Sequence, residues 1–131
     1  MSLNVRSLTW SRLSTSSVHN TCADTVPPNE YPGCDVLVTP PGRLGKRFDA
    51  KSGNVVWEFK TLRFASYPPF LRDSTIKKDV QEGGIEKSIA HQCGLGLYYA
   101  VADLEHYAAL VASGFLYVPD KLILTAECLM P

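Results

Sequence analysis

The sequence predicts an α/β protein in which a mixed sheet of about four to five strands is flanked by helices. Two observations lead to this prediction. Short β-rich runs separated by turn residues fill residues 34–62, which indicates a β-meander. Further along the chain, two helical patterns alternate with an apolar run of strand length and a last short strand, which indicates a βαβ crossover.

Length and composition fit one domain. The chain has 131 residues, of which 45% are hydrophobic and 20% are charged, as in an ordinary globular domain. We divide residues 1–131 into an N-terminal segment without clear periodicity (1–17), an ordered loop rich in Pro and Asn (18–33) and a core (34–125).

The N-terminal segment contains no recognisable targeting signal. Leu3, Leu8 and Trp10 allow one short helix there, and the segment lacks the apolar stretch of a secretory signal. No run of the chain approaches the roughly 18–20 apolar residues that span a membrane. We therefore expect no membrane partner. If the domain is exported, we expect the signal to lie outside this chain, as part of a longer polypeptide.

The predicted meander has three strands. Residues 34–39 form the first, which the following Pro-Pro-Gly sequence ends. Residues 46–50 form the second, and a turn at residues 52–54 leads into the third. Residues 55–62 (VVWEFKTL) have the strongest strand character in the chain.

A helix follows the meander. Apolar residues at helical spacing predict it over residues 70–81 and again up to residue 93. Between the two parts, Gly83 and Gly84 predict a kink or a break, because a glycine costs about 1 kcal/mol in a helix interior.

The C-terminal part completes the crossover. Residues 95–102 (LGLYYAVA) are apolar enough for a central strand that is buried on both faces. Asp103 is the predicted N-cap of a helix that ends near residue 113. Residues 122–125 form the last short strand.

The strand at residues 55–62 carries an unusual pair of charges. Because side chains alternate between the faces of a strand, Trp57 and Phe59 share one face, which suits burial against a helix. Glu58 and Lys60 share the other face, with Cα atoms about 6–7 Å apart. Charges on a half-buried strand need a partner, a metal or a wet cleft.

Asp49 ends the preceding predicted strand, and the turn after it brings Asp49 beside Glu58. Two neighbouring carboxylates repel each other unless a divalent cation lies between them. Their hard oxygen ligands suit Mg²⁺ or Mn²⁺. Lys60 would then orient or help deprotonate a water molecule, or stabilise charge on a phosphate. The alternative interpretation of these three residues is a surface salt bridge on an edge strand.

The pattern D-x8-E-x-K formed by Asp49, Glu58 and Lys60, on a meander followed by a helix, resembles the PD-(D/E)XK nuclease superfamily. The resemblance covers residues 34–125 and implies a restriction-endonuclease-like core.

The chain departs from the superfamily pattern in two places. Phe48 stands before Asp49 where the superfamily has proline. No Glu precedes residue 30, so the acidic ligand that some members contribute from a first helix is absent, and the number of metal ions stays open.

Further short matches run from residue 19 to residue 94. They are HNTCAD (19–24), PPN (27–29), PGxD (32–35), FDA (48–50), WExKT (57–61) and CG (93–94). In these segments the chain resembles restriction-endonuclease-fold toxin domains at the C-termini of bacterial polymorphic toxins, including myxobacterial ones. This resemblance implies a metal-dependent nuclease that is delivered into the cytoplasm of a competing cell. It also implies a cognate immunity protein in the producer. We expect DNA to be the substrate of the nuclease, with RNA as the alternative.

Three further residues are candidates for the site. His19 precedes the sheet and is predicted to contact phosphate or to act as an acid or base; its alternative role is to hydrogen-bond the loop backbone. Glu86 and Gln92 lie on the helix after the E-x-K strand, where related folds add auxiliary residues. A solvated helix face is the alternative for both.

The four cysteines are widely spread, which predicts free, partly buried thiols. Two alternatives involve chemistry at these thiols. His19, Cys22 and Cys34 would form an incomplete zinc site. A thiol nucleophile would be Cys22 beside His19 or Cys93 beside His91, in a hydrolase or transferase.

The formal net charge is zero, with thirteen basic and thirteen acidic residues, which argues against a wholly basic nucleic-acid binder. The charges are unevenly placed, however, because residues 43–78 hold nine basic and three acidic residues. Within this basic segment, the residues predicted to bind the phosphate backbone are Arg43, Lys46, Arg47, Lys51 and Arg63. The alternative to nuclease activity is a degenerate nuclease-fold module that binds nucleic acid or protein.

Overall fold

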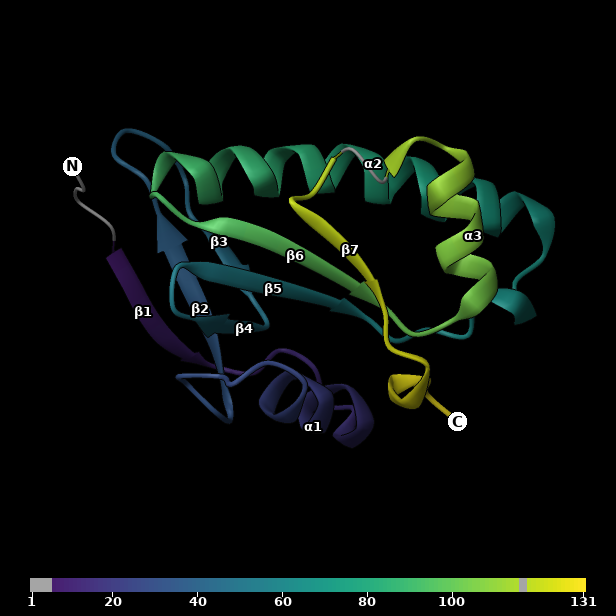
Figure 1. Cartoon of the computed structure of the whole chain (residues 1–131), viewed down its shortest axis with the longest axis horizontal. Helices are drawn as coiled ribbons and strands as arrows, with labels where there is room; N and C mark the ends of the chain where they lie inside the picture. The colour runs from purple at the N-terminus through teal and green to yellow at the C-terminus, as the bar shows by residue number, and fades with distance from the viewer. Residues whose placement is uncertain (1–5, 116–117) are drawn as a thin grey trace.

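Two sheets and three α-helices make up the part of the chain that the computed structural model describes, residues 6–115 and 118–131 (Figure 1). The strands are β1 (Arg6–Ser11), β2 (Cys34–Thr39), β3 (Lys46–Phe48), β4 (Ala50–Ser52), β5 (Val55–Lys60), β6 (Gly96–Val101) and β7 (Lys121–Leu124). The α-helices are α1 (Ser17–Thr25), α2 (Pro69–Gln92) and α3 (Leu104–Ala112), and two short 3-10 helices are η1 (Phe64–Ser66) and η3 (Ala126–Cys128).

The predicted mixed α/β class is confirmed, but the strands form two sheets instead of one. The first sheet has the order β1-β2-β3 and is antiparallel. The second has the order β4-β5-β6-β7, in which β4 and β5 are antiparallel while β5, β6 and β7 are parallel. The predicted βαβ crossover is β5-α2-β6, and α3 connects β6 to β7 in the same way.

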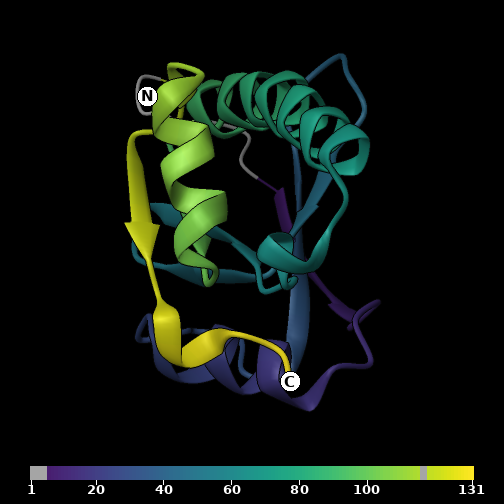
Figure 2. The same ribbon diagram turned by 90° about the vertical axis from the view of Figure 1, so that its right-hand side faces the viewer.

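The helices cover the sheets from two sides. Figure 2 shows α2 and α3 on one side and α1 with η3 on the other. On the α2 side, Val36 and Phe48 of the first sheet pack with Val56 and Ile89 in one apolar cluster, which joins the two sheets. On the α1 side, Phe59 packs with α1 and η3. No helix among the described residues is both long and apolar enough to cross a bilayer.

The predicted three-stranded meander is wrong at its second strand, which breaks at Asp49. Residues before Asp49 pair with β2, whereas residues after it pair with β5. The Asp49 N–H donates to the Trp57 carbonyl (3.0 Å), and the Asp49 side chain accepts from the Phe59 N–H (2.7 Å). These two bonds direct the chain out of the first sheet and into the second.

The N-terminal third is more regular than the sequence predicts. Arg6–Ser11 forms a strand in place of a short helix, because it pairs along its whole length with β2. Leu3 lies outside the described residues. The predicted loop at residues 18–33 begins instead with α1, which Ser16 caps by accepting a hydrogen bond from the His19 N–H (3.2 Å). Loop structure starts only after this helix.

Helix α2 continues through the predicted break at Gly83 and Gly84. A Cβ atom at Gly83 would lie 2.7 Å from a ring carbon of Phe115, so this glycine permits a close packing contact. That contact explains why the helix accepts a residue with poor helix propensity. The elements that follow agree with the sequence, since Asp103 caps α3 by accepting from the N–H groups of Glu105 and His106.

The prediction of four free thiols is wrong for two of them. Cys22 of α1 and Cys128 of η3 form a disulfide across a sequence separation of 106 residues, while Cys34 and Cys93 are free. The spacing of the cysteines gives no indication of this pairing, because it depends on the tertiary contact between α1 and η3, which lie at opposite ends of the chain. The disulfide fastens α1 beneath that sheet.

We predict that the double variant Cys22→Ser with Cys128→Ser loses about 4 kcal/mol of unfolding free energy, because its unfolded chain is no longer constrained by a loop of this length. Urea unfolding followed by tryptophan fluorescence measures the loss. The matched control is Cys34→Ser, which removes a free thiol. Equal stability of the double variant and the wild type would contradict the prediction.

Candidate active site

A cleft of about 450 Å³ lies where the two sheets meet, beside the break at Asp49. All four predicted catalytic residues line it, so the structure brings together positions that are up to 41 residues apart. The lining residues are Leu13, Ser14, His19, Asp35, Gly45, Lys46, Arg47, Asp49, Glu58, Phe59 and Lys60. A further cavity of about 550 Å³ between α2 and α3 contains none of the predicted site residues.

Asp49 and Glu58 are neighbours in this cleft, as the turn between β4 and β5 predicts. Their pKa values shift in opposite directions. Burial, the charge of Asp49 and that of Glu86 raise the pKa of Glu58 well above its ordinary value. Burial would also raise the pKa of Asp49, but the hydrogen bond and charge of His19 and the Phe59 N–H outweigh it, so this pKa is lowered. Asp49 therefore stays ionised beside a carboxyl group that resists ionisation.

Lys60 lies next to Glu58 on the cleft side of β5, as strand alternation predicts. Its Nζ is 3.6 Å from Glu58 Oε2. Burial alone would lower the pKa of Lys60, but the carboxylates of Glu58 and Glu86 outweigh it and raise this pKa. Lys60 is therefore an ammonium at neutral pH, which can hold a phosphate or a water.

His19 reaches the cleft from α1. Its Nε2 lies 3.5 Å from Asp49 Oδ2 and 3.3 Å from the Phe59 carbonyl oxygen. Its Nδ1 lies 3.1 Å from Asn20 Oδ1. Burial lowers the pKa of His19, but the hydrogen bond and charge of Asp49 outweigh burial and raise it. His19 thus contacts the backbone of β5 and a site carboxylate, and its role as a phosphate contact or as an acid or base stays a prediction.

Glu86 of α2 is buried against the same group of charges. Only 1% of the residue is exposed, and neither of its carboxylate oxygens has a hydrogen-bond partner among the described residues. Lys46 Nζ lies 3.4 Å from Glu86 Oε2. Burial raises the pKa of Glu86, despite the opposing charges of Lys46 and Lys60. The alternative of a solvated helix face is wrong for Glu86, whereas Gln92 is exposed at the end of α2 and outside the cleft.

The five predicted phosphate-binding residues divide into two groups. Lys46 and Arg47 line the cleft. Arg43 instead donates to Ser88 Oγ (3.0 Å) on α2. Lys51 pairs with Glu30, and Arg63 donates to the Met130 carbonyl (3.1 Å). The basic surplus of the sequence therefore reaches the cleft at only two of the five predicted positions.

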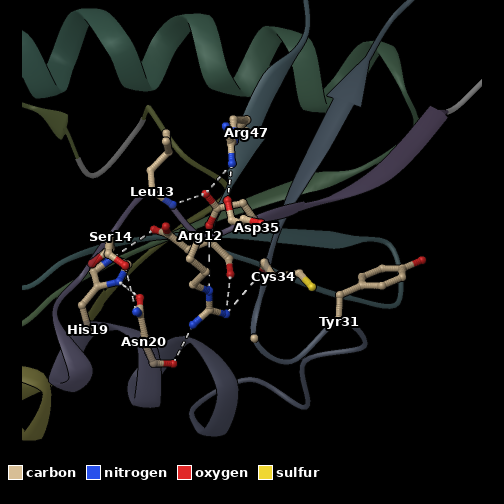
Figure 3. A network of polar contacts seen from close by, with 12 residues as sticks. Arg12, Leu13, Ser14, His19, Asn20, Tyr31, Cys34, Asp35 and Arg47 are labelled. Carbon is tan, nitrogen blue, oxygen red and sulfur yellow. Dashed lines mark hydrogen bonds and ion pairs between the residues drawn. The ribbon is translucent and has the colours of Figure 1, made fainter.

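Asp35 is a site residue that our sequence analysis did not identify. Its Oδ2 accepts from the Leu13 N–H (3.1 Å) and lies 3.4 Å from Arg47 Nη2 (Figure 3). Arg12 lies against the same carboxylate, 3.9 Å away, and also pairs with Asp24 (2.6 Å). Asp35 thus connects the cleft to the chain between β1 and α1. A clue was available, because aspartate is unfavourable inside a strand without a specific partner.

A second buried polar group lies under α2, away from the cleft lining. Asp79 Oδ2 is 2.7 Å from His106 Nε2, and the Tyr99 hydroxyl donates to Asp79 Oδ1 (2.9 Å). Burial and the charge of Asp79 raise the pKa of Tyr99. The charge of Asp79 also contributes to the raised pKa of Lys60. Asp79 therefore favours the charged form of Lys60 although it does not line the cleft.

The cysteine alternatives do not fit the structure. Cys22 is in the disulfide, so it is neither a zinc ligand beside His19 nor a nucleophile. Cys93 is buried, and burial raises the pKa of its thiol, which disfavours the reactive thiolate. The chemistry of the cleft therefore rests on oxygen and nitrogen groups.

The D-x8-E-x-K pattern implies a divalent cation, for which the cleft offers carboxylate oxygens as ligands. Among residues 6–115 and 118–131, no three His, Cys, Asp or Glu side chains form a ready-made metal cluster. Mg²⁺, however, is commonly held by one or two carboxylates, with water and substrate phosphate completing its shell. Asp49 and Glu58 fit that pattern, and a third carboxyl group, that of Glu86, lies close to Glu58 and makes no hydrogen bond with the described part of the chain.

Comparison with known proteins gives one match. The profile of DUF6310, a family of unknown function, matches residues 5–121, which is most of the chain. No curated protein and no solved structure matches the chain.

We predict that the pKa of His19 lies above its ordinary value of 6.5 and that Asp49→Asn lowers it. The raised pKa of His19 stabilises the fold fully below pH 6.5, and this contribution is lost as the pH rises through the folded-state pKa. NMR titration of the imidazole measures the pKa directly. Asp73→Asn, an exposed carboxylate on α2, is the control and leaves it unchanged. A His19 pKa that is insensitive to Asp49→Asn would refute the contact.

We predict that Glu86→Gln raises the unfolding free energy by about 1–2 kcal/mol at pH 8, because it removes a buried charge whose oxygens lack hydrogen bonds. The raised pKa of Glu86 means that the wild type loses stability as the pH rises from 4.5 through the folded-state value. The gain should therefore be smaller at pH 4. Urea unfolding at both pH values provides the measurement, with exposed Glu105→Gln as the control. A destabilised Glu86→Gln variant at pH 8 would show that the pair with Lys46 dominates.

Proposed function

Because the chain belongs to the DUF6310 family, whose function is unknown, we propose its function from its own residues: it is a metal-dependent nuclease that hydrolyses phosphodiester bonds. The observation that carries this proposal is the cleft in which Asp49 and Glu58 lie together, with Lys60 beside Glu58. These three side chains are the set that the D-x8-E-x-K pattern implies.

The proposed mechanism assigns a separate role to each side chain. Asp49 and Glu58 would hold Mg²⁺ or Mn²⁺, and this ion would supply Lewis-acid activation of the scissile phosphate and of the attacking water. His19 and the Phe59 N–H keep Asp49 ionised for this purpose. The Lys60 ammonium positions the attacked phosphate and stabilises the charge that develops on it. Lys46 and Arg47 are the cationic groups that meet the flanking phosphates.

A restriction-endonuclease-like core is part of the proposal. It would comprise the second sheet, with the E-x-K strand β5 beside β6 and the crossover helix α2 above them. The order β4-β5-α2-β6 and the parallel pairing of β5 with β6 support it. The first sheet would then be an addition that supplies Asp35, Lys46 and Arg47 to one wall of the cleft.

We further propose that the domain is a toxin used between bacteria, with DNA as its target and a cognate immunity protein as its partner. The sequence resemblance to polymorphic toxin domains supports this proposal. The disulfide between Cys22 and Cys128 also supports it, because disulfides form and persist in oxidising compartments. Delivery would be as part of a larger protein, with action in the cytoplasm of the target cell.

We predict that the purified domain degrades plasmid DNA in the presence of Mg²⁺ and that EDTA stops the degradation. Glu58→Gln weakens the site proposed to hold the metal, and Lys60→Ala removes a cation proposed to stabilise charge in the transition state, so each should reduce the rate at least about 100-fold. Gel electrophoresis with plasmid and with RNA measures the rates and separates DNase from RNase activity. Lys121→Ala, on the exposed start of β7, is the control that retains the rate.

Two outcomes would contradict the nuclease proposal. Degradation that persists in EDTA or in Glu58→Gln would show that another activity is responsible. Binding of nucleic acid without any degradation would instead support the degenerate binding module. Circular dichroism of each variant checks that the loss of rate does not come from unfolding.

A further inference from the structure

An exposed tryptophan stands beside the cleft. Trp10 is 47% exposed, although tryptophan is usually well buried. In the pairing of β1 with β2, Trp10 lies opposite Asp35, which lines the cleft. Directly opposed residues in an antiparallel pair have Cβ atoms about 5 Å apart on the same face. The indole therefore borders the cleft wall.

Arg47 holds this indole in place. Its guanidinium carbon lies 5.2 Å from the centre of the Trp10 ring, in a cation–π contact. The same guanidinium lies 3.4 Å from Asp35 Oδ2 and donates to the Ser11 carbonyl. The Arg47 guanidinium therefore contacts the indole, the Asp35 carboxylate of the cleft and the backbone of β1 at the same time, and these contacts hold the indole beside the cleft. An exposed ring that is held in this way loses little conformational freedom when a ligand stacks on it.

The same rim carries a second exposed apolar side chain. Leu13 is 72% exposed and lines the cleft, and its N–H is fixed by the Asp35 carboxylate (3.1 Å). One carboxylate therefore anchors the segments that present both Trp10 and Leu13. Beside them, Lys46 and Lys60 offer positive charge to phosphates. An exposed ring and an exposed apolar side chain next to such charges match a ligand that alternates flat bases with phosphates.

We propose that Trp10 is a stacking platform for an unpaired nucleobase, so that the cleft takes single-stranded nucleic acid in preference to duplex. The bases of a duplex already stack on one another and cannot present their faces, whereas a single strand can. This inference rests on the proposed nuclease function for its ligand, because it names the substrate of the same cleft. It assigns to Trp10 a binding role that is separate from the carboxylates and Lys60.

The test measures binding without cleavage, in the Glu58→Gln background and with EDTA present. The probes are a labelled oligothymidylate, the same oligomer with abasic sites, an oligouridylate and a duplex of equal length. Fluorescence anisotropy is expected to show that Trp10→Leu weakens binding of the oligothymidylate at least about fivefold. Binding of the abasic oligomer and of the duplex should not change. Trp10→Phe, which keeps a ring, should lose less, and Thr9→Ala on the opposite face of β1 is the control.

A direct readout comes from the indole itself. The chain has two tryptophans, so Trp57→Phe leaves Trp10 as the single fluorophore. Intact oligomers should quench its emission and abasic oligomers should not. Equal weakening of intact and abasic oligomers by Trp10→Leu, absence of quenching, or absence of binding to every probe would each overturn the proposal. Stronger loss for the oligouridylate than for the oligothymidylate would support stacking and identify RNA as the preferred strand.

The proposed function is judged separately, from Mg²⁺-dependent cleavage. Base-dependent quenching without cleavage would leave the stacking platform standing and refute the nuclease. Cleavage that requires Glu58, together with a Trp10→Leu variant that binds all probes normally, would support the nuclease and refute the stacking platform.

Discussion

The candidate site depends on the backbone break at Asp49. Two hydrogen bonds from this one residue to β5, through its N–H to the Trp57 carbonyl and through its side chain from the Phe59 N–H, take the chain from one sheet to the other. The second bond also fixes the Asp49 carboxylate beside the row that contains Glu58. The feature that separates the sheets therefore also creates the cleft between them and orients its first acidic group. A continuous strand through this position would leave a single sheet and no cleft.

The carboxyl groups of the cleft lie close together, and their different surroundings give them different pKa values. Asp49 accepts hydrogen bonds, which lowers its pKa, whereas burial raises the pKa of Glu58 and of Glu86, and the charges of Asp49 and Glu86 raise the pKa of Glu58 further. Lys60 lies within this negative field, which keeps its ammonium charged. Such an arrangement lowers the stability of the protein alone, because several buried carboxylates repel one another. Buried repulsion of this kind is typical of sites that bind a cation, since a cation removes the cost when it binds.

The sequence predicted which side chains meet at the site more accurately than it predicted the architecture around the site. The alternation along β5 placed Glu58 and Lys60 together, and the turn placed Asp49 beside them, because both depend on local geometry. In α2, the glycine at position 83 is required by Phe115, which packs against it from a distant part of the chain. The disulfide likewise joins residues 106 positions apart. Asp35 was missed for the same reason, since its partners Leu13 and Arg47 come from other elements. Long-range contacts of this kind leave no pattern in a single sequence.

The position of His19 shows how these distant contacts combine at the site. His19 belongs to α1, which several contacts from other parts of the chain hold in place. The disulfide fixes its middle to η3, Arg12 binds both Asp24 and the Asn20 carbonyl (2.8 Å), and the imidazole contacts Asp49. Arg12 also donates to the Asp49 carbonyl (3.3 Å), so it links α1 to the break in the backbone. The disulfide, in contrast, does not involve Asp49. It therefore holds the helix, and presents His19 to the cleft, whether or not the Asp49 carboxylate is engaged elsewhere.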